Sequence, residues 1–133
     1  MIKPKYYHCA MIKMQCITID CADPAALADF WSKVVDWKIG GEGDEVWIEK
    51  DLKEGETTDS PDILFLRNPD KKTVKNRLHL DLRPDNQAAE VDRLIALGAK
   101  KIEIGQSNYT ECTWVVMADP EGNEFCVLRE RKD

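Results

Sequence analysis

Short stretches of alternating apolar and polar residues recur along the chain and predict strands. The clearest is NRLHLDLRPD, where Leu78, Leu80 and Leu82 alternate with His79 and Asp81 within a strand expected over 77–83. Successive side chains of a strand point to opposite faces, so the leucines share one face and the two polar residues share the other. Similar patterns predict strands at 15–20, 37–40, 45–49, 62–67, 100–104, 113–117 and 123–129.

Two other stretches have the spacing of amphipathic helices. The first follows Asp23, a suitable N-cap, and Pro24, which fits a first helical turn. The second follows Asp85 or Asn86 as N-cap and ends at Gly98, which suits a left-handed C-terminal position. Their apolar faces consist of Leu27, Phe30, Trp31 and Val34, and of Val91, Leu94 and Ile95.

The predicted elements occur in the order β-α-β-β-β, and this order repeats. Residues recur at matching places in the two halves: Ala25, Ala26 and Asp29 as Ala88, Ala89 and Asp92, and Trp47 as Trp114. The pattern predicts an α+β domain over 14–129, with module one at 14–68 and module two at 76–129. Residues 1–13 are expected to be an N-terminal extension, 130–133 a tail, and the acidic stretch 50–61 an inserted loop.

Strand parity divides the expected sheets into two unlike faces. One face is almost purely apolar and is expected to lie under the helices: Ile17, Ile19, Ile63, Phe65, Leu78, Leu80, Leu82, Phe125 and Val127. The other face mixes small, apolar and charged residues: Cys16, Thr18, Asp20, Asp62, Leu64, Leu66, His79, Asp81, Glu124, Cys126 and Leu128. This mixture predicts an incomplete, curved mixed β-barrel around a partly polar cavity, with helices on the outer face.

Composition narrows the classes of partner. The chain has 133 residues, a formal net charge of -6 and a pI of about 5.0, which disfavours a nucleic-acid partner. No apolar stretch approaches the roughly 20 residues of a membrane span, and the first residues lack the apolar core of a secretory signal. Five cysteines without CxxC spacing indicate reduced thiols in a cytoplasmic protein.

Three segments carry a resemblance to a known family: DCADPAALADFWSKVVDWKI, NRLHLDLRPDNQAAEVDRLIALGA and WVVMADPEGNEFCVL. Over residues 14–129 the chain resembles the glyoxalase/bleomycin-resistance/dioxygenase (vicinal oxygen chelate) superfamily, in its glyoxalase-like branch. The resemblance implies that the sheets of both modules surround the site. It also implies that metal-dependent members place one ligand in the first and one in the last strand of each module. Those places hold Cys16, Leu64 (or Phe65), His79 and Cys126.

Only His79 is a usual family ligand, and both expected carboxylates are missing, so the expectation is a site without metal and without a cofactor. A zinc site of Cys16, His79 and Cys126 is the alternative, since thiolate and imidazole suit that ion. Buried cysteines, however, often act as small apolar residues.

Three residues are candidate acids and bases, and each has a structural alternative. His79 either binds ligand or transfers a proton, or is a structural hydrogen bonder. Asp81 is either a pocket acid or an ion-pair partner of Arg77 or Arg83. Glu124 is either a general acid or base with a pKa raised by burial, or the partner of a nearby cation.

Candidate ligand-binding residues come from both modules. Cys16, Thr18 and Cys126 lie on the mixed face, and Trp47 and Trp114 are placed to stack on a flat or cationic ligand, unless they are structural. The turn ADPEGN is interpreted as turn chemistry without a catalytic role.

The sequence therefore predicts a homodimeric protein that binds a small organic molecule in a partly polar cavity, with no nucleic-acid or membrane partner. Three alternatives remain. One is a metal-independent lyase, isomerase or epimerase that uses His79 with Glu124 or Asp81. Another is a drug-sequestering protein of the bleomycin-resistance type. The third is a metal-dependent glyoxalase or dioxygenase with atypical ligands.

Overall fold

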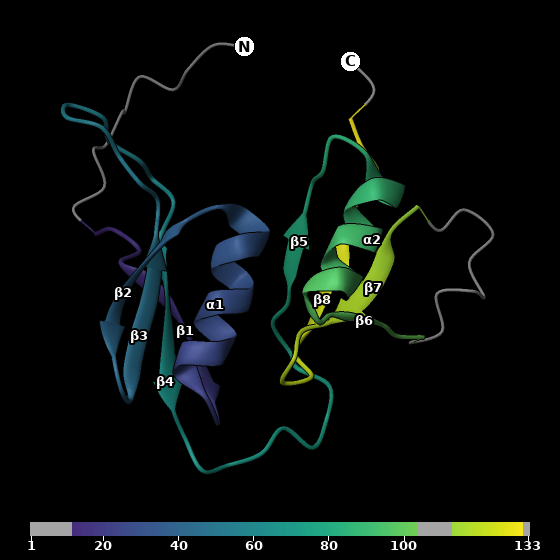
Figure 1. Ribbon diagram of the computed structural model, residues 1–133, viewed down its shortest axis with the longest axis horizontal. Coiled ribbons are helices and arrows are strands. Elements are labelled where there is room, and N and C mark those ends of the chain that lie inside the picture. Colours follow the sequence, from purple (N-terminus) through teal and green to yellow (C-terminus); the bar gives the residue numbers. More distant parts are fainter. Residues whose placement is uncertain (1–11, 104–112, 132–133) are drawn as a thin grey trace.

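The described part of the chain folds into two sheets and two helices (Figure 1). The computed structural model describes residues 12–103 and 113–131. Its elements are β1 (Cys16–Cys21), α1 (Pro24–Val35), β2 (Lys38–Glu42), β3 (Glu45–Glu49), β4 (Asp62–Arg67), β5 (Leu80–Leu82), α2 (Gln87–Leu97), β6 (Lys100–Lys101), β7 (Val115–Ala118) and β8 (Glu124–Val127). The predicted α+β class and the repeated β-α-β-β-β order are confirmed.

Each module forms a four-stranded mixed sheet. The strand orders are β1-β4-β3-β2 and β5-β8-β7-β6. In each sheet the first strand pairs in parallel with the last strand of its module, and the other pairs are antiparallel. The equivalent topologies confirm the duplication that the sequence predicted.

The helix ends follow their capping residues. The Asp23 side chain accepts a hydrogen bond from the backbone N–H of Ala26 at 3.1 Å, and Pro24 opens α1. Of the two N-caps considered for α2, Asn86 makes the bond, to the N–H of Ala89. Gly98 ends α2 at φ 118, in the left-handed region, as expected. None of the helices in the described segments is long and apolar enough to cross a membrane.

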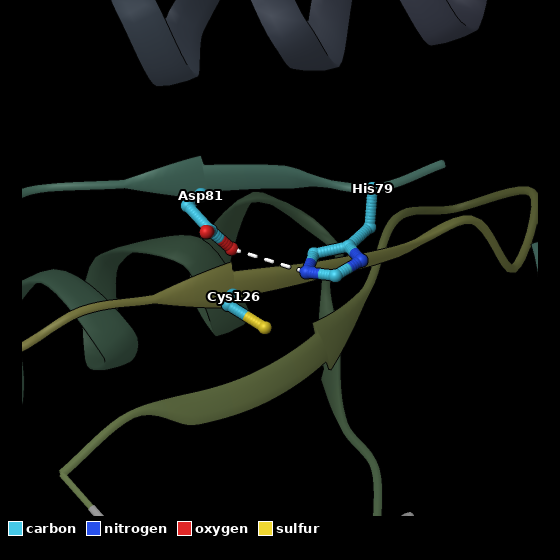
Figure 2. Close-up of side chains that lie close together, drawn as sticks. All are labelled: His79, Asp81 and Cys126. Carbon is cyan, nitrogen blue, oxygen red and sulfur yellow. Dashed lines mark ion pairs between the residues drawn. The ribbon is translucent and has the colours of Figure 1, made fainter. Parts of the chain in front are cut away.

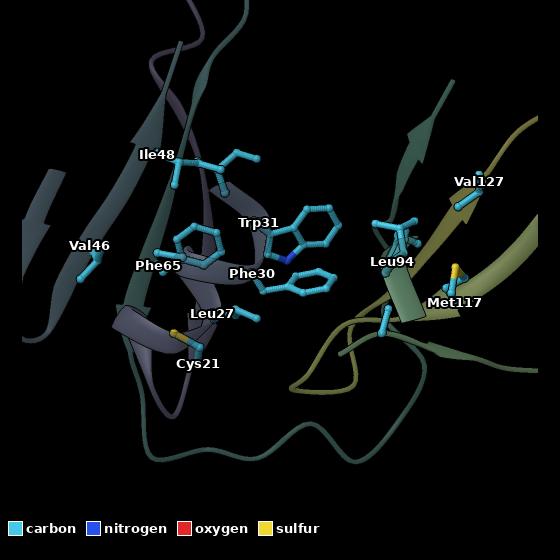
Figure 3. Packing of buried hydrophobic residues seen from close by; sticks show 14 of the residues in the cluster. Cys21, Leu27, Phe30, Trp31, Val46, Ile48, Phe65, Leu94, Met117 and Val127 are labelled. Carbon is cyan, nitrogen blue, oxygen red and sulfur yellow. The ribbon is translucent and has the colours of Figure 1, made fainter. Parts of the chain in front are cut away.

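One apolar core joins the two modules through α1 (Figure 3). One side of α1 packs on Phe65 and Ile48 of the first sheet, while Trp31 faces the second module. The Trp31 and Phe125 ring centroids lie 5.0 Å apart in an edge-on arrangement. Helix α1 therefore lies between the two sheets (Figure 1). The expectation that both helices cover the outer face is wrong for α1, because its Trp31 packs on the second module.

The predicted apolar face is confirmed at the centre of both sheets and wrong at one end. Ile63, Phe65, Phe125 and Val127 are at most 6% exposed. Leu78, expected beside them, is 70% exposed. Strand β5 starts only at Leu80, because its partner β8 begins at Glu124 and offers no strand for Leu78 to pair with.

The ADPEGN turn connects the modules in a way that turn chemistry alone did not predict. The buried Asp119 carboxylate accepts a hydrogen bond from Trp31 Nε1 at 3.0 Å. Both Glu121 carboxylate oxygens accept bonds from module one, from the N–H groups of Ala22 and Asp23, at 2.6 and 3.0 Å. These bonds hold the turn of module two against the start of α1.

The same carboxylates affect Cys21, which is 3% exposed. Burial, followed by the negative charges of Glu121, Asp23, Asp20 and Asp119, raises the pKa of the Cys21 thiol to about 11. Because the thiolate is the reactive species, Cys21 has very little nucleophile at neutral pH.

We expect Cys21 to resist alkylation in the folded protein. Iodoacetamide at pH 8 should modify the half-buried Cys16 at least about tenfold faster than the buried Cys21, because a pKa of about 11 leaves only about 0.1% of Cys21 as thiolate at that pH. Peptide mapping by mass spectrometry over a time course measures both rates, and the urea-unfolded chain is the control in which they should converge. Equal rates in the folded protein would contradict the prediction.

Candidate functional site

A cleft of about 500 Å³ lies between the two modules. Its floor is apolar and includes Ile17 and Ile19 of β1, Leu80 and Phe125 of the second sheet, and Trp31. The expectation that the mixed face alone surrounds the cavity is therefore wrong, because the strand residues of this floor belong to the apolar face. Its rim is mostly polar, apart from Val74 and Leu78, and is formed largely by the connection 68–79, which links the modules along the lower edge of the molecule in Figure 1. The arrangement suits an organic molecule with an apolar body and polar substituents.

The structure places three of the sequence-predicted site residues on this cleft. They are Thr18, His79 and Glu124. Asp81, Cys126, Cys16, Trp47 and Trp114 are not among the residues that line it. A second hollow of about 840 Å³, beside Cys21 and Glu121, contains none of the predicted site residues.

Glu124 anchors the connection between the modules. Lys72 Nζ lies 2.7 Å from its Oε1, and the Asn76 N–H donates to its Oε2 at 3.2 Å. Asn76 is held again by its side-chain amide, which donates to Asn123 Oδ1 at 2.9 Å. Both oxygens of Glu124 therefore have partners, and its side chain is only 10% exposed.

The expectation that Glu124 has a raised pKa is wrong. Burial alone would raise the pKa of this carboxyl, but hydrogen bonds from Lys72 and from backbone N–H groups, together with the Lys72 charge, lower it below the ordinary value. Glu124 is therefore ionised at neutral pH and can accept a proton but not donate one. Of the two interpretations of Glu124, the structure supports the partner of a nearby cation.

His79, Asp81 and Cys126 form a compact cluster in module two (Figure 2). His79 Nε2 lies 3.2 Å from Asp81 Oδ1, and one donor atom from each of the three residues lies within 4.8 Å of the others. Asp81 and Cys126 are direct partners across the parallel β5–β8 pair, and His79 precedes Asp81 by two residues. The cluster lies on the face of this sheet that points away from α1 (Figure 2).

The cluster resolves which partner Asp81 has. Neither expected arginine contacts it: the Arg83 guanidinium donates to the Arg129 carbonyl, and the ion pair of Asp81 is with His79. The His79 and Asp81 side chains are 40% and 51% exposed, whereas Cys126 is 8% exposed. The cluster is therefore open to solvent on one side and closed by the sheet on the other.

Cys16 lies apart from this cluster. Its sulfur is 3.7 Å from Thr18 Oγ1 in β1, and it is not part of the His79 group. Leu64, which has no donor atom, pairs with Thr18 across the β1–β4 ladder. The two family positions in module one therefore do not fit a metal, whereas the two in module two lie together with Asp81.

The two repeated tryptophans are half-buried. The Trp47 indole lies over Gly40 and Gly41 of the neighbouring strand, where a Cβ added to either glycine would lie 2.5 Å from the ring. Because neither glycine has a side chain, the Trp47 ring can pack directly on the backbone of β2. Trp47 has a packing role in the sheet, which was its structural alternative.

Sequence reasoning missed residues 68–76 of the connection as part of the site. Asn68, Lys72 and Asn76 lie between predicted strands and have no periodicity that assigns them to a face. Their only signal was a cation, Lys72, available for a buried carboxylate. Their position depends on contacts far away in the sequence, above all on Glu124.

A sequence model described as Glyoxalase-like domain matches residues 16–128, most of the chain. The chain belongs to the glyoxalase-like domain family. The resemblance to the glyoxalase/bleomycin-resistance/dioxygenase superfamily is thereby confirmed. No curated protein shows a significant match to this glyoxalase-like domain.

Solved structures share its fold at low sequence identity. A glyoxalase/bleomycin resistance protein/dioxygenase family enzyme from Burkholderia phytofirmans PsJN has a TM-score of 0.66 and 18% identity, covering 90% of this chain and 100% of that one. TnmS3, an antibiotic binding protein from Streptomyces sp. CB03234, has a TM-score of 0.58 and 16% identity, covering 93% of this chain and 100% of that one. The trypanothione-dependent glyoxalase I of Leishmania major has a TM-score of 0.59 and 12% identity, covering 90% of this chain and 87% of that one.

Proposed function

We propose that this glyoxalase-like domain binds a small organic molecule in the cleft between its modules, through direct side-chain contacts that need no metal ion. The observation that carries the proposal is the cleft itself: about 500 Å³, with an apolar floor and a polar rim. Pockets for small ligands are typically about 300–1,000 Å³ and combine mostly apolar walls with a few polar groups. The antibiotic-binding relative supports a binding role in this fold.

The side chains on the cleft give the ligand a preferred orientation. Ile17, Ile19 and Phe125 offer apolar contact, while Thr18 and His79 offer hydrogen bonds at the rim. Lys72 and Glu124 neutralise each other, so this pair adds no net charge to the wall. We therefore infer a ligand with a flat or compact apolar body and hydrogen-bonding substituents.

Filling the cleft tests the proposal. With EDTA-treated protein and 8-anilinonaphthalene-1-sulfonate as the probe, we expect saturable binding that Ile17→Trp weakens at least tenfold, because the larger side chain occupies the floor. The matched control is Ile39→Trp, at an exposed position of β2 outside the cleft, which should bind like the parent protein. Unchanged binding by a folded Ile17→Trp variant would refute the proposal, and circular dichroism establishes folding.

A second candidate, metal-independent proton transfer by His79, is favoured by one contact. Asp81 Oδ1 lies 3.2 Å from His79 Nε2, so the carboxylate orients the ring. His79 also lines the cleft and would meet a bound molecule there. In such a lyase or isomerase His79 is the acid or base, Asp81 positions it, and Glu124 holds the connection in place.

The domain is expected to form a homodimer. Val74 and Leu78, both on the cleft rim, are 74% and 70% exposed, and a second copy would remove this apolar surface from water. Sedimentation equilibrium at micromolar concentration should give twice 15.2 kDa at both low and high salt, because apolar contacts are only weakly screened. Leu78→Asp should shift the equilibrium toward monomer, whereas a 15.2 kDa species of the parent protein at every concentration would rule out the dimer.

A further inference from the structure

We propose that His79, Asp81 and Cys126 form a zinc-type metal site whose three protein ligands all come from module two. The cluster joins a nitrogen, an oxygen and a sulfur donor on one face of the β5–β8 pair. The inference goes beyond the proposed ligand binding, which needs no metal.

The spacing of the donors suits a tetrahedral ion. Zinc lies about 2.0–2.2 Å from nitrogen and oxygen ligands and about 2.3 Å from sulfur, so tetrahedral N–O edges are about 3.3–3.5 Å and edges to sulfur about 3.5–3.7 Å. The His79 Nε2 to Asp81 Oδ1 distance of 3.2 Å is already close to such an edge. The Cys126 sulfur lies within 4.8 Å of both other donors, so a side-chain rotation brings it into range.

The backbone explains why the donors converge. Asp81 and Cys126 are Cα partners in a parallel pair, which puts their side chains side by side on the same face. His79 is two residues before Asp81 and so points to that face as well. The three donors are therefore brought together by the ladder and by strand periodicity, and no loop has to close over them.

The donor set selects the class of metal. Thiolate with imidazole favours zinc or cobalt(II), whereas magnesium and calcium prefer oxygen ligands alone. Three protein ligands leave a fourth position open, and the half-exposed side chains of His79 and Asp81 leave that position accessible to solvent. Cys126, buried at 8% exposure, shields the other side of the site.

This set differs from the one that the family resemblance implies, which takes two ligands from each module. Module one offers Leu64, which has no donor, and Cys16, whose sulfur lies beside Thr18 and outside the cluster. The third ligand is instead Asp81, which stands at a position that the resemblance does not assign to a ligand. Only His79 of the three also lines the cleft, so the ion would lie on the sheet face that points away from α1 rather than on the cleft floor, and when bound it would supply a Lewis acid at that face.

Titration with cobalt(II) tests the site directly. We use the full chain under reducing conditions with Cys9→Ser and Cys112→Ser, which remove two thiols outside the described residues. The expected result is one equivalent of bound cobalt with a sulfur-to-cobalt charge-transfer band in the near ultraviolet. Zinc should displace the cobalt and raise the melting temperature, so neither readout depends on an enzymatic activity.

Single substitutions decide which residues bind the ion. Cys126→Ser should abolish the charge-transfer band, and Asp81→Asn and His79→Gln should each weaken binding at least tenfold. The matched control is Cys16→Ser, the cysteine of module one, which should leave the band and the affinity unchanged. His79 and Asp81 are half-exposed, so their variants should fold even if Cys126→Ser does not.

Three outcomes would overturn the inference: no stoichiometric cobalt, an unaltered cobalt affinity in folded Asp81→Asn and His79→Gln proteins, or equal loss on Cys16→Ser. The last would instead support the set of Cys16, His79 and Cys126. The proposed function has a separate test, since probe binding is measured in EDTA. Probe binding without cobalt binding would reject only the metal site. Cobalt binding without probe binding would reject only the proposal that the cleft binds a small molecule.

Discussion

Replacing Phe125 with alanine is expected to lower the free energy of unfolding by about 3–5 kcal/mol. Phe125 is 1% exposed, and its ring lies 5.0 Å from that of Trp31 and 6.5 Å from that of Phe30, both on α1. Its removal would leave a cavity at the point where module two packs on module one. Urea unfolding, followed by far-ultraviolet circular dichroism, gives the free energy.

Two further variants separate this effect from a general loss of apolar surface. Phe125→Leu retains most of the volume and should cost less than half as much. Ile95→Ala, at a position 46% exposed on α2, should change the stability by no more than about 0.5 kcal/mol. A Phe125→Ala protein as stable as Ile95→Ala would mean that the core does not continue across the modules.

Asp119→Ala is expected to lower the free energy of unfolding by about 3–4 kcal/mol. The sequence alone had indicated only a role in forming the turn. The carboxylate is 4% exposed and accepts bonds from Trp31 Nε1, from Asn123 Nδ2 and from the backbone N–H groups of Glu121 and Asn123. Truncation leaves the buried Trp31 Nε1 and the partly buried donors of Glu121 and Asn123 without this acceptor, and an unsatisfied buried donor is more costly than the bond it made was stabilising.

Asp119→Asn keeps one acceptor oxygen and should lose only about 1–2 kcal/mol in the same urea titration. The control is Asp29→Ala, which removes an exposed pair with Lys33 and should cost less than about 0.5 kcal/mol. If Asp119→Ala and Asp29→Ala proved equally stable, the hydrogen bonds of the buried Asp119 carboxylate, including the one that joins the modules through Trp31, would not contribute to stability.

Local patterns were reliable wherever a short-range rule determines the structure. Asp23, Pro24 and Gly98 each adopt the capping position expected of them, because helix ends are satisfied by residues within one turn. Alternation placed Phe65 and Phe125 in the core, because successive side chains of a strand must point to opposite faces. The duplicated order of elements and the family segments were sufficient for the fold class.

The chemical properties of the candidate site residues were harder to predict, because they depend on neighbouring residues from other parts of the chain. The pKa of Glu124 is lowered because Lys72 and Asn76 approach it from a connection without a periodic pattern. Leu78 is exposed because β8 begins too late to pair with it. Neither fact can be obtained from the residues on either side, since partner and register are tertiary properties.

The sequence by itself determined that this chain forms two equivalent modules, where their helices begin and end, and which face of the central strands enters the core. Periodicity and capping depend on residues only a few positions apart, so both can be recognised from the sequence alone. The tertiary structure decided that Asp119 and Glu121 hold the modules together, that a cleft opens between them, and that Asp81 lies beside Cys126. These contacts join residues tens of positions apart, and only the packing of α1 between the sheets brings the modules close enough to form the cleft.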